Sequence, residues 1–332
     1  MLCSSFFIFG KNMSSTLKMQ PMYVQVKRGS AASRYYAASA KSAVIKGSRK
    51  TDLKNFGGKT LPKMIYKNYY LGGTSAWKES DIDAIEKATI QVMRHKQLNT
   101  VLAQYFDHQA LFCDALEAEI LATPKPVEVT QGDIEKFTKD LFLAGQIKDS
   151  DLAVTIFNFI LPRGSVLNTK QKLTNNLTNE EQTIPGKIRR AASSLDGLGG
   201  YHSSVHAKRT GGSEATIYYS VDVFSDKLAN GQENGIVAFD DAWKNVVATL
   251  HHELNEFRTD PDVGDSIRED NADFLGWMAD DGNEIGDFPL LHADPVTEVI
   301  KEIKLTGKKF SLPFQMLYSN TIHGAENPFK VR

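Results

Sequence analysis

The chain has 332 residues, of which 41% are hydrophobic, and its 39 Lys and Arg residues nearly balance its 40 Asp and Glu residues. This is an ordinary globular composition, and a net charge of −1 gives no global field that would draw the protein to nucleic acid or to an anionic membrane. Two cysteines cannot build a disulfide framework. No apolar run reaches the ~20 residues that span a bilayer, so we predict no integral membrane segment.

The chain is expected to contain one folded domain behind a loose leader. Residues 27–60 are rich in Ser, Ala, Lys and Gly and show no sustained period, so residues 1–59 are predicted to be flexible or weakly ordered and residues 60–332 to form one α/β domain. The start contains the run Phe6-Phe7-Ile8-Phe9 but lacks a basic segment and a clear cleavage site, which makes it a poor signal peptide and favours a cytoplasmic location.

The predicted elements alternate between strands and helices before they end in a hairpin and a long helix. In chain order they are a strand over 63–71, a helix over 80–94, a helix over 130–143, a central strand over 152–161, an exposed loop over 168–183, a hairpin of 198–206 with 215–224, a helix over 241–257, a short helix over 296–304 and a strand over 310–318. We therefore expect an α/β (α+β) fold with a mixed central sheet and flanking helices.

The segment His252-Glu253-Leu254-Asn255-Glu256 carries the clearest chemical signal. On the predicted helix, an apolar stripe would face the core, and His252 and Glu256 would fall together on the opposite side, where they would line a polar cleft. An imidazole and a carboxylate one turn apart, with a second carboxylate between them, is the layout of a metallohydrolase helix. The stripe consists of Trp243, Val246, Val247, Leu250, Leu254 and Phe257.

Several stretches together resemble the plant EXORDIUM (phosphate-induced protein) family and its bacterial relatives. They are Gly200-Tyr201-His202-Ser203; the HExxE motif from His252 to Glu256 with Thr259-Asp260-Pro261; and Gly276-Trp277 followed by Asn283-Glu284-Ile285-Gly286-Asp287. Weaker similarity brings the coverage to about two thirds of the chain. The resemblance implies a zincin-like metallopeptidase domain whose plant members are extracellular, although this chain lacks the cysteines of those members. The location therefore stays open between the cytoplasm and the exterior.

The motif assigns roles to the residues of this helix. A catalytic zinc typically has three protein ligands and a water, and a neighbouring carboxylate takes the proton of that water. His252 and Glu256 would be helix ligands and Glu253 the general base. The third ligand is predicted to be Glu284, which matches the family's Glu in an acidic turn, or Asp287 close behind it. His202, on a hairpin strand that could flank the cleft, is another option, either as a ligand or as a stabiliser of a developing oxyanion.

The donor set bears on the identity of the ion. One imidazole and two carboxylates form a harder set than two imidazoles, so zinc is expected first, and manganese, iron or calcium would also suit. We therefore predict a zinc-dependent metallopeptidase that acts on a peptide or protein substrate. The alternative is a non-catalytic binding or signalling domain that retains a structural metal site. The sequence specifies no oligomeric state.

Overall fold

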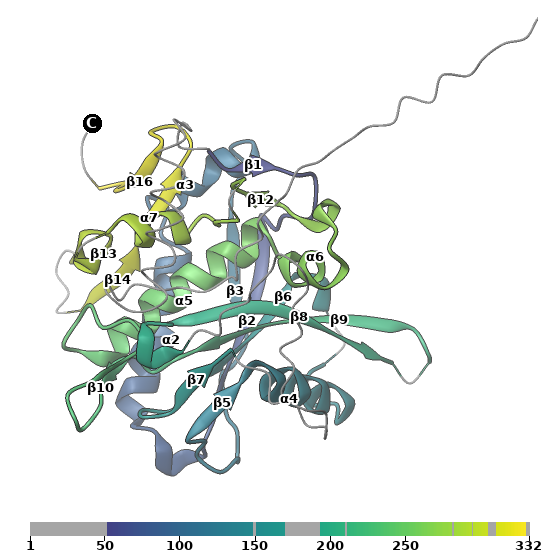
Figure 1. Cartoon of the computed structure of the whole chain (residues 1–332), viewed down its shortest axis with the longest axis vertical. Helices are drawn as coiled ribbons and strands as arrows, with labels where there is room; N and C mark the ends of the chain where they lie inside the picture. The colour runs from purple at the N-terminus through teal and green to yellow at the C-terminus, as the bar shows by residue number, and fades with distance from the viewer. Residues whose placement is uncertain are drawn as a thin grey trace, which may run out of the picture.

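The computed structural model describes residues 52–148, 151–169, 193–209, 211–280, 282–293, 295–304 and 310–329. Most of the predicted N-terminal extension and most of the predicted loop over 168–183 lie outside these residues. Helices cover both faces of a mixed central sheet (Figure 1), so the predicted fold class is confirmed. Part of the predicted extension is joined to the folded domain: β1 (Lys54–Asn55) pairs with β12 (Trp277–Met278) in antiparallel orientation.

The central sheet has the strand order β3-β2-β6-β9-β8. A short strand, β4, pairs with the C-terminal end of β2, beyond the part of β2 that pairs with β3. All of its pairings are parallel except the antiparallel hairpin of β8 with β9. Every residue of the middle strand β6 is buried, as expected for an apolar strand covered on both faces. The strands are β2 (Lys63–Tyr70), β3 (Phe112–Ala115), β4 (Glu119–Ile120), β6 (Thr155–Ile160), β8 (Gly200–Lys208) and β9 (Glu214–Asp222).

The two faces of the sheet carry separate hydrophobic cores, because successive side chains of a strand point to opposite sides. One core holds Tyr69, Phe159 and Tyr219 beneath α4 (Gln131–Leu143), whose capping box at Thr130 confirms the predicted helix start. Beside α4 lies the small parallel pair of β5 (Glu128–Thr130) and β7 (Val166–Asn168). The other face is covered by α2 (Glu79–Met93), α5 (Ala242–Thr259) and α6 (Val263–Glu269), as Figure 1 shows.

The long helix α5 has the predicted position and the predicted core face. Leu250, Leu254 and Phe257 are fully buried in the core that α5 shares with the sheet. The helix ends at Thr259, next to Asp260 and Pro261, where proline disfavours helix at the residue before it. The opposite side does not line an open cleft, however, since every residue from Asn245 to Thr259 is buried. That part of the prediction is wrong, because a third layer covers α5.

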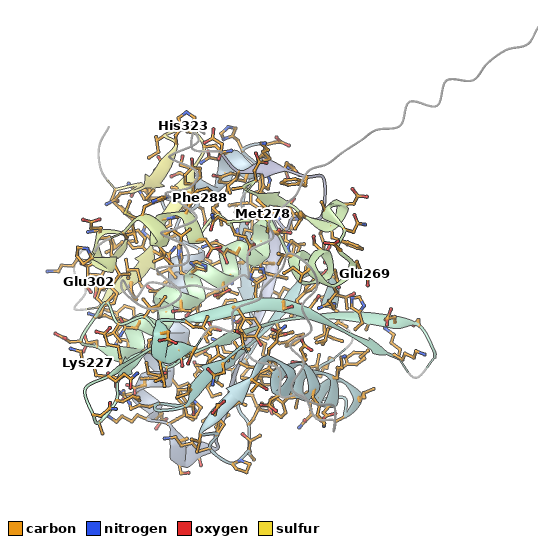
Figure 2. All side chains as sticks on the ribbon, viewed as in Figure 1. Lys227, Glu269, Met278, Phe288, Glu302 and His323 are labelled. Carbon is orange, nitrogen blue, oxygen red and sulfur yellow. The ribbon has the colours of Figure 1, made fainter. Side chains whose placement is uncertain are left out.

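This third layer comes from the C-terminal part of the chain and lies over α5 on the side away from the sheet, where Figure 2 labels Phe288 and Met278. It contains α7 (Asp287–His292), the antiparallel pair β13 (Ile300–Lys304) with β14 (Ser311–Gln315), and the pair β15 (Leu317–Ser319) with β16 (Gly324–Glu326). The predicted helix over 296–304 is therefore wrong: it is a 3-10 turn, Val296–Glu298, followed by β13, because pairing with β14 replaces helical hydrogen bonds.

The remaining short elements connect these layers. They are α3 (Asn99–Ala103), the pair β10 (Asp226–Lys227) with β11 (Glu233–Asn234), and the 3-10 turns Thr74–Ala76, Gln104–Phe106, Leu152–Val154, Ser194–Asp196 and Ala272–Phe274. Among the described residues, none of the helices combines the length and the apolar character needed to cross a membrane. Cys113 is a buried thiol in the core, and its pKa is raised to about 11 by burial.

Candidate metal centre

The side chains predicted to form the site come together between α5, the hairpin strand β8 and the third layer. Helix α5 supplies one imidazole and two carboxylates, β8 supplies the second imidazole, and the segment that leads into α7 supplies two more carboxylates. Their exposed fractions are 0% for His202, 0% for His252, 1% for Glu253, 2% for Glu256, 0% for Glu284 and 8% for Asp287. The site is therefore built from ionisable groups that are almost fully removed from water.

His202 is the centre of one half of the site. Its Nδ1 lies 3.2 Å from Oε2 of Glu253 and 3.8 Å from Oε2 of Glu256. Its Nε2 lies 3.3 Å from the backbone oxygen of Asp260, the residue that follows α5, and 3.8 Å from Oε1 of Glu284. The hairpin strand thus places its imidazole against three carboxylates rather than at the rim of a cleft.

His252 is the centre of the other half. Its Nε2 lies 2.9 Å from Oε1 of Glu256 and 3.8 Å from Oδ1 of Asp287. Its Nδ1 lies 3.0 Å from Oε1 of Gln315, whose amide nitrogen donates to the carbonyl of Gly286 at 2.7 Å. The backbone N–H of Gly286 in turn donates to Oε1 of Glu256 at 3.1 Å. The third layer therefore fixes the ring of His252 and one oxygen of Glu256 together.

Two glycines allow the backbone to approach these side chains closely. A Cβ at Gly286 would lie 2.4 Å from Nδ1 of His252, well inside the range that real contacts show. A Cβ at Gly200, on β8, would lie 3.2 Å from Oε1 of Glu253 and 2.7 Å from the carbonyl oxygen of Val221. Larger residues at these positions would push the imidazole and the carboxylate out of place.

Burial dominates the electrostatics of the site. It raises the pKa of Glu253 well above its ordinary value, and the charges of Glu256 and Asp222 raise it further. It also raises the pKa of Glu284, which the charges of Glu256 and Asp260 raise further. Burial lowers the pKa of His202. For His252 burial works against the charged ring, but the neighbouring carboxylate of Glu256 brings its pKa above the ordinary value.

Several carboxylate oxygens at the site accept no hydrogen bond from any described residue. They are both oxygens of Glu284, Oε1 of Glu253, Oδ2 of Asp260 and Oδ1 of Asp222. A buried carboxylate without a partner is costly, because water no longer solvates it. The usual partners of such groups are metal ions or cationic side chains, so this arrangement meets the requirements of a cation site.

Five of the six predicted site residues form two sets of three whose donor atoms lie within 4.8 Å of one another. One set is His202, Glu253 and Glu256, and the other is His252, Glu256 and Asp287. Glu256 belongs to both. Glu284 belongs to neither set, although its Oε1 lies near His202. The structure thus places all six residues in one cluster, and His202 and Asp287 each join a different half of it.

A row of polar side chains leads across the sheet to this cluster. Asn68 on β2, Asn158 on β6, Ser220 on β9 and His202 on β8 stand in register on the face that α5 covers. The amide of Asn158 donates to Asn68 at 2.8 Å, and Asn68 donates to Glu86 of α2 at 2.7 Å. The hydroxyl of Ser220 lies 2.9 Å from Oδ1 of Asn158.

The reasoning from the sequence did not include Asp222, Asp260 and Gln315 among the site residues. Two of them had a detectable signal. Asp222 alternates with apolar residues between Val221 and Val223, and Gln315 is a lone polar residue between Phe314 and Met316. A polar residue in a buried strand commonly has a specific hydrogen-bond partner, which here lies at the candidate site.

No family model, curated protein or solved structure matches this chain. The resemblance to the EXORDIUM family therefore stays a prediction that rests on the motifs quoted above.

Proposed function

We propose that this protein is a metal-dependent hydrolase with zinc as its first candidate ion. The observation that carries the proposal is the cluster itself: two imidazoles face buried carboxylates, several of whose oxygens have no partner among the described residues. A divalent cation bound there would act as a Lewis acid and lower the pKa of a bound water. Manganese, iron or calcium would also suit this oxygen-rich donor set.

The residues have distinct proposed roles in this reaction. His252, Glu256 and Asp287 would hold the ion, since their donor atoms form one compact group. Glu253 would accept the proton of the attacking water, because the motif places it between the two helix ligands and its buried Oε1 accepts no hydrogen bond from the described residues. His202 would either bind a cation or steady the negative charge that develops on the substrate oxygen. Peptides are the proposed substrate on the strength of the resemblance and of the HExxE motif alone.

A glutamine variant of Glu253 tests the proposed chemistry. Glu253→Gln keeps the shape of the side chain but cannot accept a proton, so hydrolysis of a peptide library should fall by at least about 100-fold. Glu269→Gln, an exposed position on α6 that is labelled in Figure 2, is the control and should keep full activity. Hydrolysis at the wild-type rate by Glu253→Gln would refute the role of Glu253.

The second candidate function is that of a non-catalytic binding or signalling domain with a structural cation. The near-complete burial of the site favours it, because a substrate must reach a catalytic ion and a structural ion needs no access. Under this reading, chelation lowers the melting temperature and the wild-type protein hydrolyses no peptide of the library. Under the hydrolase reading, chelation abolishes an activity that is restored when zinc is added back.

A further inference from the structure

The tautomers of both imidazoles follow from their outer contacts. Nε2 of His202 faces the backbone carbonyl of Asp260 at 3.3 Å, and a carbonyl oxygen can only accept a hydrogen bond. Nε2 therefore carries the hydrogen. This is the arrangement found around metal-binding histidines, whose second ring nitrogen donates to a carbonyl or a carboxylate.

The same reasoning applies to His252. The amide nitrogen of Gln315 donates to the carbonyl of Gly286 at 2.7 Å, and the reverse orientation of the amide would place two acceptors together. The amide oxygen of Gln315 must therefore face Nδ1 of His252, at 3.0 Å, and Nδ1 must carry the hydrogen. When both imidazoles are neutral, as a metal ligand must be, the other nitrogen of each has a free lone pair.

Both of these nitrogens lie close to carboxylate oxygens. Nδ1 of His202 faces Glu253 at 3.2 Å and Glu256 at 3.8 Å. Nε2 of His252 faces Glu256 at 2.9 Å and Asp287 at 3.8 Å. A metal ion or a shared proton can lie between such a lone pair and a carboxylate oxygen. The site has two such positions, one beside Nδ1 of His202 and one beside Nε2 of His252, and Glu256 borders both.

We infer that the cluster binds two divalent cations that share Glu256 as a bridging ligand. One oxygen of Glu256, Oε1, belongs to the half with His252, and the other, Oε2, belongs to the half with His202. This inference rests on the proposed metal centre and adds a second ion to it. In the second position Glu253 is a ligand through Oε2, and its Oε1, which accepts no hydrogen bond from the described residues, remains available as the base.

The distances support this arrangement. Ligand atoms about 2.1 Å from a tetrahedral zinc are roughly 3.4 Å apart. The separations of 3.2 and 3.8 Å around His202 bracket that value, whereas the 2.9 Å contact of His252 with Glu256 must open by about half an ångström to admit an ion. Paired catalytic ions lie about 3.5–4 Å apart, a separation that a bridging carboxylate spans.

The number of ligand groups also supports the second ion. Four carboxylates neighbour the two positions: Glu253, Glu256, Glu284 and Asp287. One ion with three protein ligands would leave part of this set without a role as ligand. Both oxygens of Glu284 are buried and accept no hydrogen bond from the described residues, so this side chain is available to complete a coordination shell.

Metal content measured on the full chain tests the inference. The protein is stripped with a chelator, loaded with zinc, separated from free zinc, and measured by mass spectrometry. The wild type should hold about two zinc ions per chain. His202→Ala and Glu253→Gln should each reduce the content to about one, and so should His252→Ala. Glu269→Gln should leave it at the wild-type value.

The outcomes separate this inference from the function on which it rests. About one zinc in the wild type, unchanged in Glu253→Gln, would overturn the second position but leave the single-ion hydrolase standing. If the protein binds no zinc, and also binds no manganese or calcium when loaded with these ions, both the two-ion inference and the proposed hydrolase are overturned. A second measurement needs no variant: the paramagnetic resonance spectrum of the manganese-loaded wild type should show exchange coupling between the ions, and the pattern of isolated ions at full loading would refute the bridge.

Discussion

The fully buried Asp222 leads to a prediction about the metal-free protein. The Ser220 hydroxyl lies 2.6 Å from Oδ2 of Asp222 and 2.9 Å from Oδ1 of Asn158, but it has one hydrogen to donate. A protonated Asp222 resolves this conflict, because it donates to Ser220, which then donates to Asn158. Burial raises the pKa of Asp222 to about 7, which agrees with this chain of donors.

The effect of this group on stability follows from its two pKa values. Because the pKa in the folded protein lies above the ordinary value of 3.8, the folded state holds the proton more tightly than the unfolded state. Stability is therefore greatest below pH 4 for this group, falls as the pH rises, and levels off above pH 7. The whole loss is about 4 kcal/mol, at 1.36 kcal/mol per pKa unit, and about 2.5 kcal/mol of it falls between pH 5 and pH 8.

Asp222→Asn should remove this dependence, since an amide can donate to Ser220 at any pH. The assay is urea unfolding of chelator-treated protein at pH 5 and pH 8. Between these values the variant should lose about 2.5 kcal/mol less stability than the wild type. Asp83→Asn, exposed on α2, is the control and should behave as the wild type does. An equal loss in Asp222→Asn and wild type would refute the assignment of a neutral, proton-donating Asp222.

Two further predictions concern the contacts that hold His252. Gln315→Met removes the acceptor for Nδ1–H and should weaken zinc binding by about 10–100-fold in calorimetric titrations, whereas an unchanged affinity would show that this bond does not orient the ring. Gly286→Ala should abolish binding at the His252 position, because the added Cβ would lie 2.4 Å from the ring; Gly132→Ala, which has open space at the corresponding point, should bind zinc normally. Wild-type zinc content in Gly286→Ala would mean that the ring can move without loss of the site.

Local patterns in the sequence were sufficient for much of the fold. The apolar stripe of α5 and the stop at Pro261 place that helix correctly, and the apolar run of β6 identifies the centre of the sheet. The pattern failed at residues 300–304, where Val299, Ile300 and Ile303 have helical spacing. There the antiparallel partner β14 decides the conformation, and a partner remote along the chain has no local signature.

Local patterns in the sequence predicted only part of the candidate site. The motif placed His252 and Glu256 on one side of a helix, and that side was expected to meet solvent. Its burial depends on α7, β14 and β8, which come from distant parts of the chain. The role of Gln315 was equally hidden, because only the fold brings its amide to the ring of His252.

The row of polar groups across the sheet shows why this cluster differs from an ordinary buried network. From Glu86 to Ser220 each acceptor meets a donor, so this part of the row needs nothing beyond the protein. Where the row reaches His202, acceptors outnumber donors, and buried carboxylate oxygens are left without partners among the described residues. A network that serves packing alone has no reason to end in this way, since apolar residues of similar volume would avoid the cost. A polar core that is satisfied at one end and deficient in positive charge at the other is what cation binding requires.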